Sequence, residues 1–208
     1  MNSPAEHPNY ARSAPIGAGR PLAWLVTVTG GLGLLASSVL TWDRLRLESD
    51  PGFRPACDIG SVLSCTDVMR SDQASAFGVH NTTLGLVAYA VVVVVGVALV
   101  TGARLPRWAW AALNAGAFAG AVFCMWLMGQ SLYVLGALCL WCCVTWAATI
   151  ALFWYTTLFS IGHGVLRAPR RLAAPLREFH WAVPALWYAA VAGLIAGRFA
   201  EQWQAVLF

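Results

Sequence analysis

The sequence predicts an all-α, polytopic membrane protein, and its composition and its apolar runs carry this prediction. The chain of 208 residues is 59% hydrophobic and 11% charged, with a mean hydropathy of +0.66, whereas soluble domains are roughly 45–50% apolar. Its apolar residues gather in runs near the length of about 20 residues that a helix needs to cross a bilayer. No basic stripe of the kind that binds nucleic acid accompanies the formal net charge of +4.

Five apolar runs follow one another along the chain, after a Pro- and Gly-rich segment over residues 1–20 that we expect to be a disordered cytoplasmic tail. The first run is too long for the apolar region of a signal peptide, about 7–15 residues, so we expect a retained membrane helix. A polar loop over residues 43–80 follows, and a basic loop over residues 159–180 precedes the marginal fifth run and tail, 181–208. The expected runs are residues 21–42, 81–100, 108–128, 131–159 and 181–197, with a tight turn at Gly129 and Gln130 between the third and fourth.

The distribution of arginine predicts the orientation, because cytoplasmic segments of membrane proteins carry an excess of basic residues. With the N-terminus in the cytoplasm, eight of the 13 arginines fall inside, and the other five fall outside with seven of the nine acidic residues. This orientation places the loop over residues 43–80 and the start of the fourth run outside a plasma or inner membrane. The eight inner residues are Arg12, Arg20, Arg104, Arg107, Arg167, Arg170, Arg171 and Arg177.

Two of the six cysteines, Cys57 and Cys65, lie in the expected outer loop, with seven residues between them. A disulfide can close such a short loop without difficulty. Ser64, followed by Asp67 three residues later, resembles a capping box at the start of a short helix. Cys65 would then be the first helical residue, where free amides and the helix dipole stabilise a thiolate. We therefore expect a disulfide that exchanges, rather than one that is only structural.

A second pair, Cys139 and Cys142, forms a CxxC motif near the start of the fourth run. Thiols three residues apart lie on one side of a helix, here about 12 Å from its expected outer end. The spacing is typical of a redox dithiol or of half a metal site, and buried cysteines also serve as packing residues. Because both pairs face the oxidising compartment, we favour redox chemistry over a zinc or iron–sulfur site.

A dithiol at the membrane edge needs an electron acceptor, and a lipid-soluble quinone reaches that position more easily than glutathione does. An aromatic pocket for a quinone has four candidates, each of which also suits helix packing: Trp126, Tyr133, Trp141 and Trp146. Cys124 and Cys143 match no motif, and we expect them to be packing residues.

Together these motifs resemble the vitamin K epoxide reductase family over roughly residues 24–155. The order of the parts carries the resemblance: a first helix, an outer loop with a cysteine pair, and a CxxC late in the bundle. An unrelated family of bacterial quinone-linked disulfide generators has the reverse order. The matching residues are Cys57-Asp58-Ile59-Gly60, Ser64-Cys65, Phe77-Gly78, Asn81 with Gly85, and Tyr133-Val134-Leu135 ahead of the CxxC.

The resemblance implies a four-helix catalytic bundle over residues 21–158, packed around a quinone (menaquinone or ubiquinone), with the fifth transmembrane helix added to it. It also implies a relay in which a thioredoxin-fold partner of the DsbA type exchanges with Cys57. Cys65 would then attack Cys139 of a Cys139–Cys142 disulfide, and Cys142 would reduce the quinone.

Two further residues follow from the resemblance. Asn81 matches a position that hydrogen-bonds a quinone carbonyl, although Asn is also favoured as a helix N-cap. The family's second carbonyl partner is a Tyr four residues after the CxxC, where this chain has Trp146. Bacterial relatives often carry a fused thioredoxin-like domain after the fifth helix. None follows Phe208, so we expect a separate partner protein.

We therefore predict a membrane thiol–disulfide oxidoreductase that drives disulfide-bond formation, with Cys57, Cys65, Cys139 and Cys142 as catalytic residues and no metal. Asn81, Trp146 and Tyr133 are the predicted quinone-binding residues. Three alternatives are an enzyme that reduces vitamin K epoxide itself, a metal-binding bundle that uses the four cysteines, and a non-catalytic membrane assembly factor.

Overall fold

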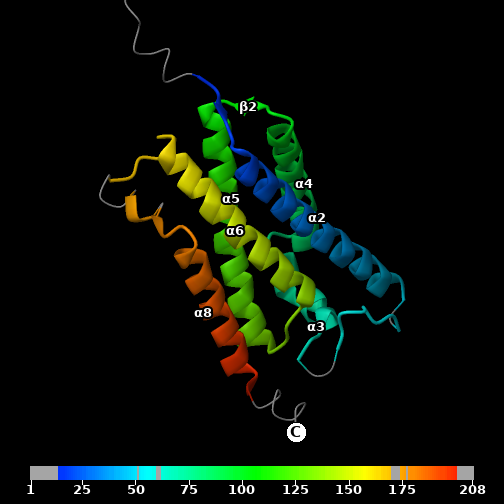
Figure 1. Cartoon of the computed structure of the whole chain (residues 1–208). Helices are drawn as coiled ribbons and strands as arrows, with labels where there is room; N and C mark the ends of the chain where they lie inside the picture. Colours follow the sequence, from blue (N-terminus) through cyan, green and yellow to red (C-terminus); the bar gives the residue numbers. More distant parts are fainter. Residues whose placement is uncertain (1–13, 51, 60–61, 170–173, 177, 201–208) are drawn as a thin grey trace, which may run out of the picture.

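Four long helices form the body of the computed structural model, which describes residues 14–50, 52–59, 62–169, 174–176 and 178–200. Each helix is long and apolar enough to cross a membrane, and for α5 this span includes the helical turn that follows it. Helix α2 packs on α4 and α6, and α5 packs on α6 (Figure 1). The all-α, polytopic membrane architecture is thus confirmed. The helices are α2 (Arg20–Ser49), α4 (Asn81–Val100), α5 (Arg107–Gly129) and α6 (Leu140–Gly162).

Small residues let α2 and α4 approach closely, as is usual between membrane helices. A Cβ atom on Gly96 would lie 2.7 Å from the backbone of Thr27, so no larger residue fits there. Polar contacts then join the pair to the rest of the bundle. The Tyr89 hydroxyl of α4 lies 2.6 Å from the Thr149 hydroxyl oxygen of α6.

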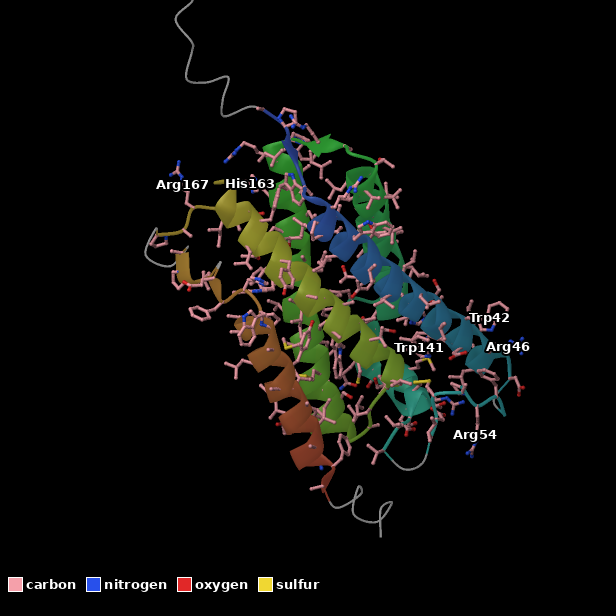
Figure 2. All side chains as sticks on the ribbon, in the orientation of Figure 1. Trp42, Arg46, Arg54, Trp141, His163 and Arg167 are labelled. Carbon is pink, nitrogen blue, oxygen red and sulfur yellow. A yellow bond between two sulfur atoms is a disulfide. The ribbon has the colours of Figure 1, made fainter. Side chains whose placement is uncertain are left out.

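The shorter elements gather at the two ends of the bundle. At one end, β1 (Ile16–Gly17) pairs antiparallel with β2 (Arg104–Leu105), and Arg107 donates hydrogen bonds to the carbonyls of His163 and Gly164. At the other end lie α3 (Cys65–Arg70), the 3₁₀ turn η1 (Asp72–Ser75) and the π-helical turn η2 (Gln130–Leu135). In Figure 2, His163 and Arg167 lie at the first end, the arginine end, and Arg46 and Arg54 lie at the second, the cysteine end.

The first helix ends later than its apolar pattern predicts. We expected it over residues 21–42, but α2 continues to Ser49. The extra turns are amphipathic and polar, and they carry an ion pair between Arg44 and Glu48, with Nε and Oε1 3.1 Å apart. Such i, i+4 pairs stabilise exposed helical turns. The predicted start of the loop at residue 43 is therefore wrong, and the loop begins at Asp50.

The predicted tight turn at Gly129 and Gln130 is also wrong. The chain continues from α5 into η2 and reverses only at Gly136, whose φ of 64° is left-handed. The fourth helix accordingly starts at Leu140, not at residue 131, so Cys139 precedes α6 and does not lie about 12 Å along it.

A further helix, α8 (Ala182–Arg198), packs on α6, close to the expected fifth run over residues 181–197. It is apolar but shorter than the four long helices. Arg198 donates a hydrogen bond to the Leu132 carbonyl of η2 over 2.9 Å, so α8 reaches the cysteine end. Residues 1–13 of the expected tail over residues 1–20 lie outside the described part of the chain. So do Gly60, Arg170, Arg171, Arg177 and residues 201–208.

Candidate active site

The loop cysteines form a disulfide at the start of α3. Cys57 and Cys65 are bonded to each other, and both are buried. Ser64 is the N-cap of α3, and its hydroxyl accepts a hydrogen bond from the Asp67 amide over 3.2 Å. The predicted cap and the place of Cys65 as the first helical residue are both confirmed. The Asp58 carboxylate accepts hydrogen bonds from the Thr66 amide and hydroxyl, which fixes the loop against the same helix.

Cys139 is the N-cap of α6, and its sulfur accepts a hydrogen bond from the Cys142 amide over 3.4 Å. A helix N-terminus favours negative charge. The pKa of the Cys139 thiol is lowered because the Cys142 thiol and the amides of Cys142 and Trp141 donate hydrogen bonds to it, and burial only partly opposes them. The CxxC thus places a stabilised sulfur at the helix start and a second thiol within the first turn.

A short parallel pairing of backbones brings the two cysteine pairs together. Leu63 and Leu138 form a parallel bridge. Its hydrogen bonds run from the Leu138 amide to the Val62 carbonyl and from the Ser64 amide to the Leu138 carbonyl, each over 2.9 Å. Cys139 directly follows Leu138, and Cys65 directly follows Ser64, whose amide makes one of these bonds, so both helices begin side by side. The Ser64 amide is engaged by Leu138, so the capping box lacks its reciprocal bond.

The sulfur atoms of Cys65 and Cys139 lie 3.3 Å apart, and neither residue is measurably exposed. Cys139 and Cys142 are free thiols, and Cys65 is bonded to Cys57. A thiolate on Cys139 is therefore in contact with a disulfide sulfur, and such contact is the starting point of thiol–disulfide exchange. The metal-binding alternative finds little support, because among the described residues the candidate ligand cluster is Cys57, Asp58 and Cys65, and its thiols form the disulfide.

A cavity of about 70 Å³ lies behind the CxxC, between α2, α4, η2 and α6. By this measure one water needs about 10–15 Å³, so the cavity has room for several atoms of a ligand. Cys142 and Trp146 line the cavity. Its polar lining residues are Arg44, Ser71, Gln73, His80, Asn81, Thr82, Gln130 and Ser131. The remaining wall is mainly apolar and includes Leu40, Val68, Leu127 and Leu135.

The three predicted quinone-binding residues take different places. Trp146 is buried and lines the cavity. Asn81 also lines it, as the first residue of α4. His80 is the N-cap of α4, so the structure does not give Asn81 the alternative role of helix cap. The Asn81 carboxamide instead accepts from the Ala76 amide and donates to the Gln73 carbonyl. Tyr133 is 63% exposed on η2 and is not among the described residues that line the cavity.

Sequence reasoning missed Arg44 and the pairing of Leu63 with Leu138. Arg44 follows an apolar run and precedes Glu48 by four residues, a pattern that indicates a continued helix and was available in the sequence. A two-residue bridge between distant segments leaves no periodic signal. Cys124 is buried in a cluster with Trp146, and Cys143 packs against that cluster.

The fold and the site together define a class: a polytopic membrane protein that holds a dithiol against a disulfide at one end of its helices. Residues 24–157 match the model of the vitamin K epoxide reductase family, and the chain belongs to this family. It is therefore an oxidoreductase, in a family of membrane thiol–disulfide oxidoreductases that are generally linked to quinones and thioredoxin-like partners. A comparison with curated proteins finds no match.

Proposed function

We propose that this protein oxidises a thioredoxin-fold partner of the DsbA type and passes the electrons to a quinone, which drives disulfide-bond formation. The carrying observation is the 3.3 Å separation of the Cys65 and Cys139 sulfurs, with Cys142 of the same CxxC lining a cavity. It gives the electrons a continuous path of sulfur atoms from the loop to that cavity.

The relay consists of successive thiolate attacks on disulfides. The Cys65 thiolate attacks Cys139 of a Cys139–Cys142 disulfide, which joins Cys65 to Cys139 and releases the Cys142 thiolate. Cys57 then attacks Cys65, restoring the Cys57–Cys65 disulfide and releasing Cys139. The structure has this final arrangement, with the loop pair oxidised and the CxxC reduced. Because Cys57 is itself buried, exchange with a partner requires the loop to open locally.

The cavity suits a quinone by the chemistry of its walls. Its wall is mainly apolar, Trp146 offers an aromatic face, and the Thr82 hydroxyl oxygen is buried without a partner among the described residues. Leaving a buried hydroxyl unpaired costs about 1–3 kcal/mol, and a change of the Thr82 rotamer towards a ligand oxygen would remove that cost. A bound quinone accepts two electrons and two protons from the Cys139–Cys142 dithiol. Asn81 and Trp146 would orient it beside Cys142.

The test uses purified protein in detergent, a reduced thioredoxin-fold protein and a short-chain quinone. We expect quinone absorbance to fall in step with the appearance of disulfide in the added protein, and mass mapping to find both Cys57–Cys65 and Cys139–Cys142 disulfides during turnover. Failure of the quinone to oxidise the reduced CxxC would contradict the proposal. Protection of the four thiols by zinc would instead support the metal-binding alternative.

A further inference from the structure

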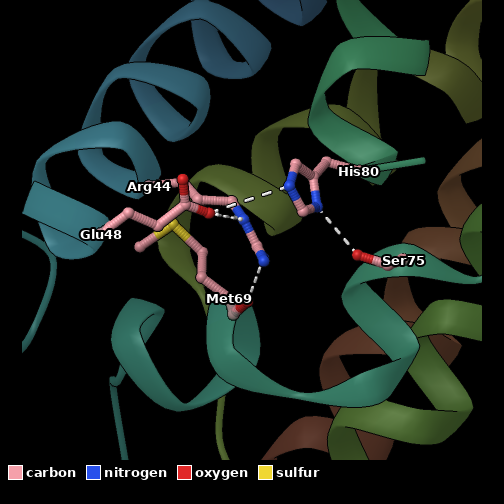
Figure 3. A network of polar contacts seen from close by, with 5 residues as sticks. All are labelled: Arg44, Glu48, Met69, Ser75 and His80. Atoms are coloured by element: carbon pink, nitrogen blue, oxygen red, sulfur yellow. Dashed lines mark hydrogen bonds and ion pairs between the residues drawn. The ribbon is translucent and has the colours of Figure 1, made fainter. Parts of the chain in front are cut away.

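The cavity beside Cys142 has a charged group whose role the relay does not explain. Arg44 extends from α2 to line the cavity, and its side chain is only 20% exposed. Its Nε donates to Glu48 over 3.1 Å, and its Nη1 donates to the Met69 carbonyl at the end of α3 (Figure 3). These two contacts hold the guanidinium in one place.

The two contacts leave donors unused. A guanidinium has five N–H groups and cannot be deprotonated in a protein, and only two have partners among the described residues. Thr82 lines the same cavity, and its hydroxyl oxygen is buried without a partner among the described residues. A fixed guanidinium with unused donors, at a cavity whose surface is mainly apolar, matches a ligand with an oxygen that carries negative charge.

Such charge develops at the step that the proposed function requires, on which this inference rests. The Cys139 and Cys142 thiols form one disulfide and release two electrons and two protons. The quinone takes up both, and electrons that arrive ahead of protons leave negative charge on its oxygen. Preorganised donors aimed at developing charge are among the strongest contributions to catalysis.

We propose that Arg44 is a catalytic residue that stabilises negative charge on the acceptor oxygen, and that Glu48 is the residue that positions it. His80, which also lines the cavity, is the other titratable group in this network. Its Nε2 lies 3.8 Å from Glu48 Oε1, and its Nδ1 lies 2.8 Å from the Ser75 hydroxyl (Figure 3). A purely structural Arg44 would only satisfy the Met69 carbonyl and hold α3 against α2.

The test compares Arg44→Gln and Arg44→Lys with Arg46→Gln as the matched control. Arg46 lies on the same helix, but its guanidinium packs 5.2 Å from the centre of the Trp42 ring, and it does not line the cavity. The first measurement is single-turnover oxidation of prereduced enzyme by a short-chain quinone. We expect Arg44→Gln to slow it by about 10²–10³-fold, the usual loss for one such donor. The rate should fall less in Arg44→Lys. The rate of Arg46→Gln should stay within about twofold of that of the unmodified protein.

Two further readouts separate catalysis from structure. Quinone affinity, followed by quenching of tryptophan fluorescence in a Cys142→Ala background, should fall much less than the rate, because the oxygen is charged only after electron transfer. Exchange between Cys65 and Cys139 without quinone should not change.

Equal rates in Arg44→Gln and Arg46→Gln would overturn the inference. So would a matching loss of Cys65–Cys139 exchange, which would assign Arg44 a structural role. The unmodified protein is measured before any variant. If quinone fails to oxidise it, the proposed function itself is overturned. If Arg44→Gln does not fold, Arg44→Lys carries the test, with a loss of about tenfold expected and an unchanged rate contradicting it.

Discussion

Cys65 and Cys139 meet across the site, and each stands at the start of a helix with its neighbours' amides close by. Cys65 follows the Ser64 cap of α3, and Cys139 is itself the cap of α6. Free amides at a helix start stabilise a thiolate. The Cys142 amide donates to the Cys139 sulfur, whereas the amides of Thr66 and Asp67 after Cys65 donate to Asp58 and Ser64. Amide stabilisation is therefore seen at Cys139, the first sulfur of the CxxC.

Replacement of Cys142 tests the last step of the relay. We expect Cys142→Ala to reduce quinone oxidation of the enzyme to the uncatalysed background, because Cys139 then has no partner with which to form a disulfide. Cys139 should instead become trapped with Cys65, 3.3 Å away. Mass mapping of disulfides measures this species. Cys143→Ala is the control, because that neighbouring thiol packs against a core cluster, and it should keep nearly full activity.

Replacement of Cys57 tests the entry of electrons. Cys57→Ala should abolish turnover with a reduced thioredoxin-fold protein, because Cys57 is the proposed point of exchange with the partner. Oxidation of a chemically reduced Cys139–Cys142 pair by quinone should persist within about twofold. Stopped-flow measurement of both half-reactions distinguishes them, and normal turnover with the protein substrate would show that the entry point lies elsewhere.

Single residues near a covalent or capping motif were the most predictable part of the site. The Ser64 cap follows from local sequence. The short loop makes a Cys57–Cys65 disulfide easy to close, but four cysteines permit three pairings, and the one present is known from the structure. Asn81 and Trp146 were named from the family resemblance, and both line the cavity. Arg44 and Thr82 were missed because their importance depends on a cavity between helices, which no local pattern encodes.

At the scale of elements, the segment from η2 to α6 determines where the CxxC lies. Ser131 accepts a hydrogen bond from the Ala137 amide through its carbonyl, and its hydroxyl donates to the Ala137 carbonyl. Gly136 supplies the left-handed residue between them. The sequence pattern misplaced this turn by several residues, because the apolar run continues through η2 and the π-helical turn does not interrupt it.

Gly136 therefore controls the approach of Cys139 to Cys65. Gly136→Ala should lower the free energy of unfolding by about 1–2 kcal/mol, the cost of a left-handed conformation in a residue with a Cβ. It should also slow Cys65–Cys139 exchange. Gly129→Ala is the matched control, because Gly129 is helical and a Cβ there meets nothing within 4 Å. Thermal unfolding in detergent measures the stability, and trapping of the mixed disulfide measures the exchange rate. Equal stability and equal exchange rates in the two variants would show that Gly136 does not control the approach of Cys139 to Cys65.

At the scale of the whole molecule, a close contact near the arginine end holds together α2 and α4, the two helices that flank the cysteine loop. Gly96→Ala should destabilise the protein by about 1–3 kcal/mol, a typical cost of overpacking, because its Cβ would press on the Thr27 backbone. Gly31→Ala, where a Cβ meets nothing within 4 Å, should be neutral or slightly stabilising. A similar thermal stability of the two variants would show that the helices separate easily.

The four-helix architecture was predictable because bilayer thickness dictates the length of apolar runs. The helix ends were less predictable. The polar tail of α2 and the turn η2 lie beyond the reach of hydropathy, since ion pairing and backbone hydrogen bonds decide them. The arginine bias that predicts orientation depends on residues outside the described part of the chain. Among the described residues, Arg20, Arg104, Arg107 and Arg167 lie at the arginine end and five others lie at the cysteine end, so the orientation stays a prediction. The five are Arg44, Arg46, Arg54, Arg70 and Arg198.

Orientation decides whether the relay meets an oxidising compartment, and one exposed position at each end tests it. Ser49 ends α2 near the cysteine end, and Thr101 lies in the turn after α4 at the arginine end; both are exposed. Each is replaced by Cys in a chain whose six cysteines are Ala, and intact cells are treated with a membrane-impermeant maleimide.

We expect Ser49→Cys to be labelled directly and Thr101→Cys only after permeabilisation, because basic residues are retained on the cytoplasmic side. The reverse pattern would place Cys57 and Cys65 in the reducing cytosol, where disulfides rarely persist. The exchange geometry would then run as a reductive relay, and the proposed direction of electron flow would be wrong.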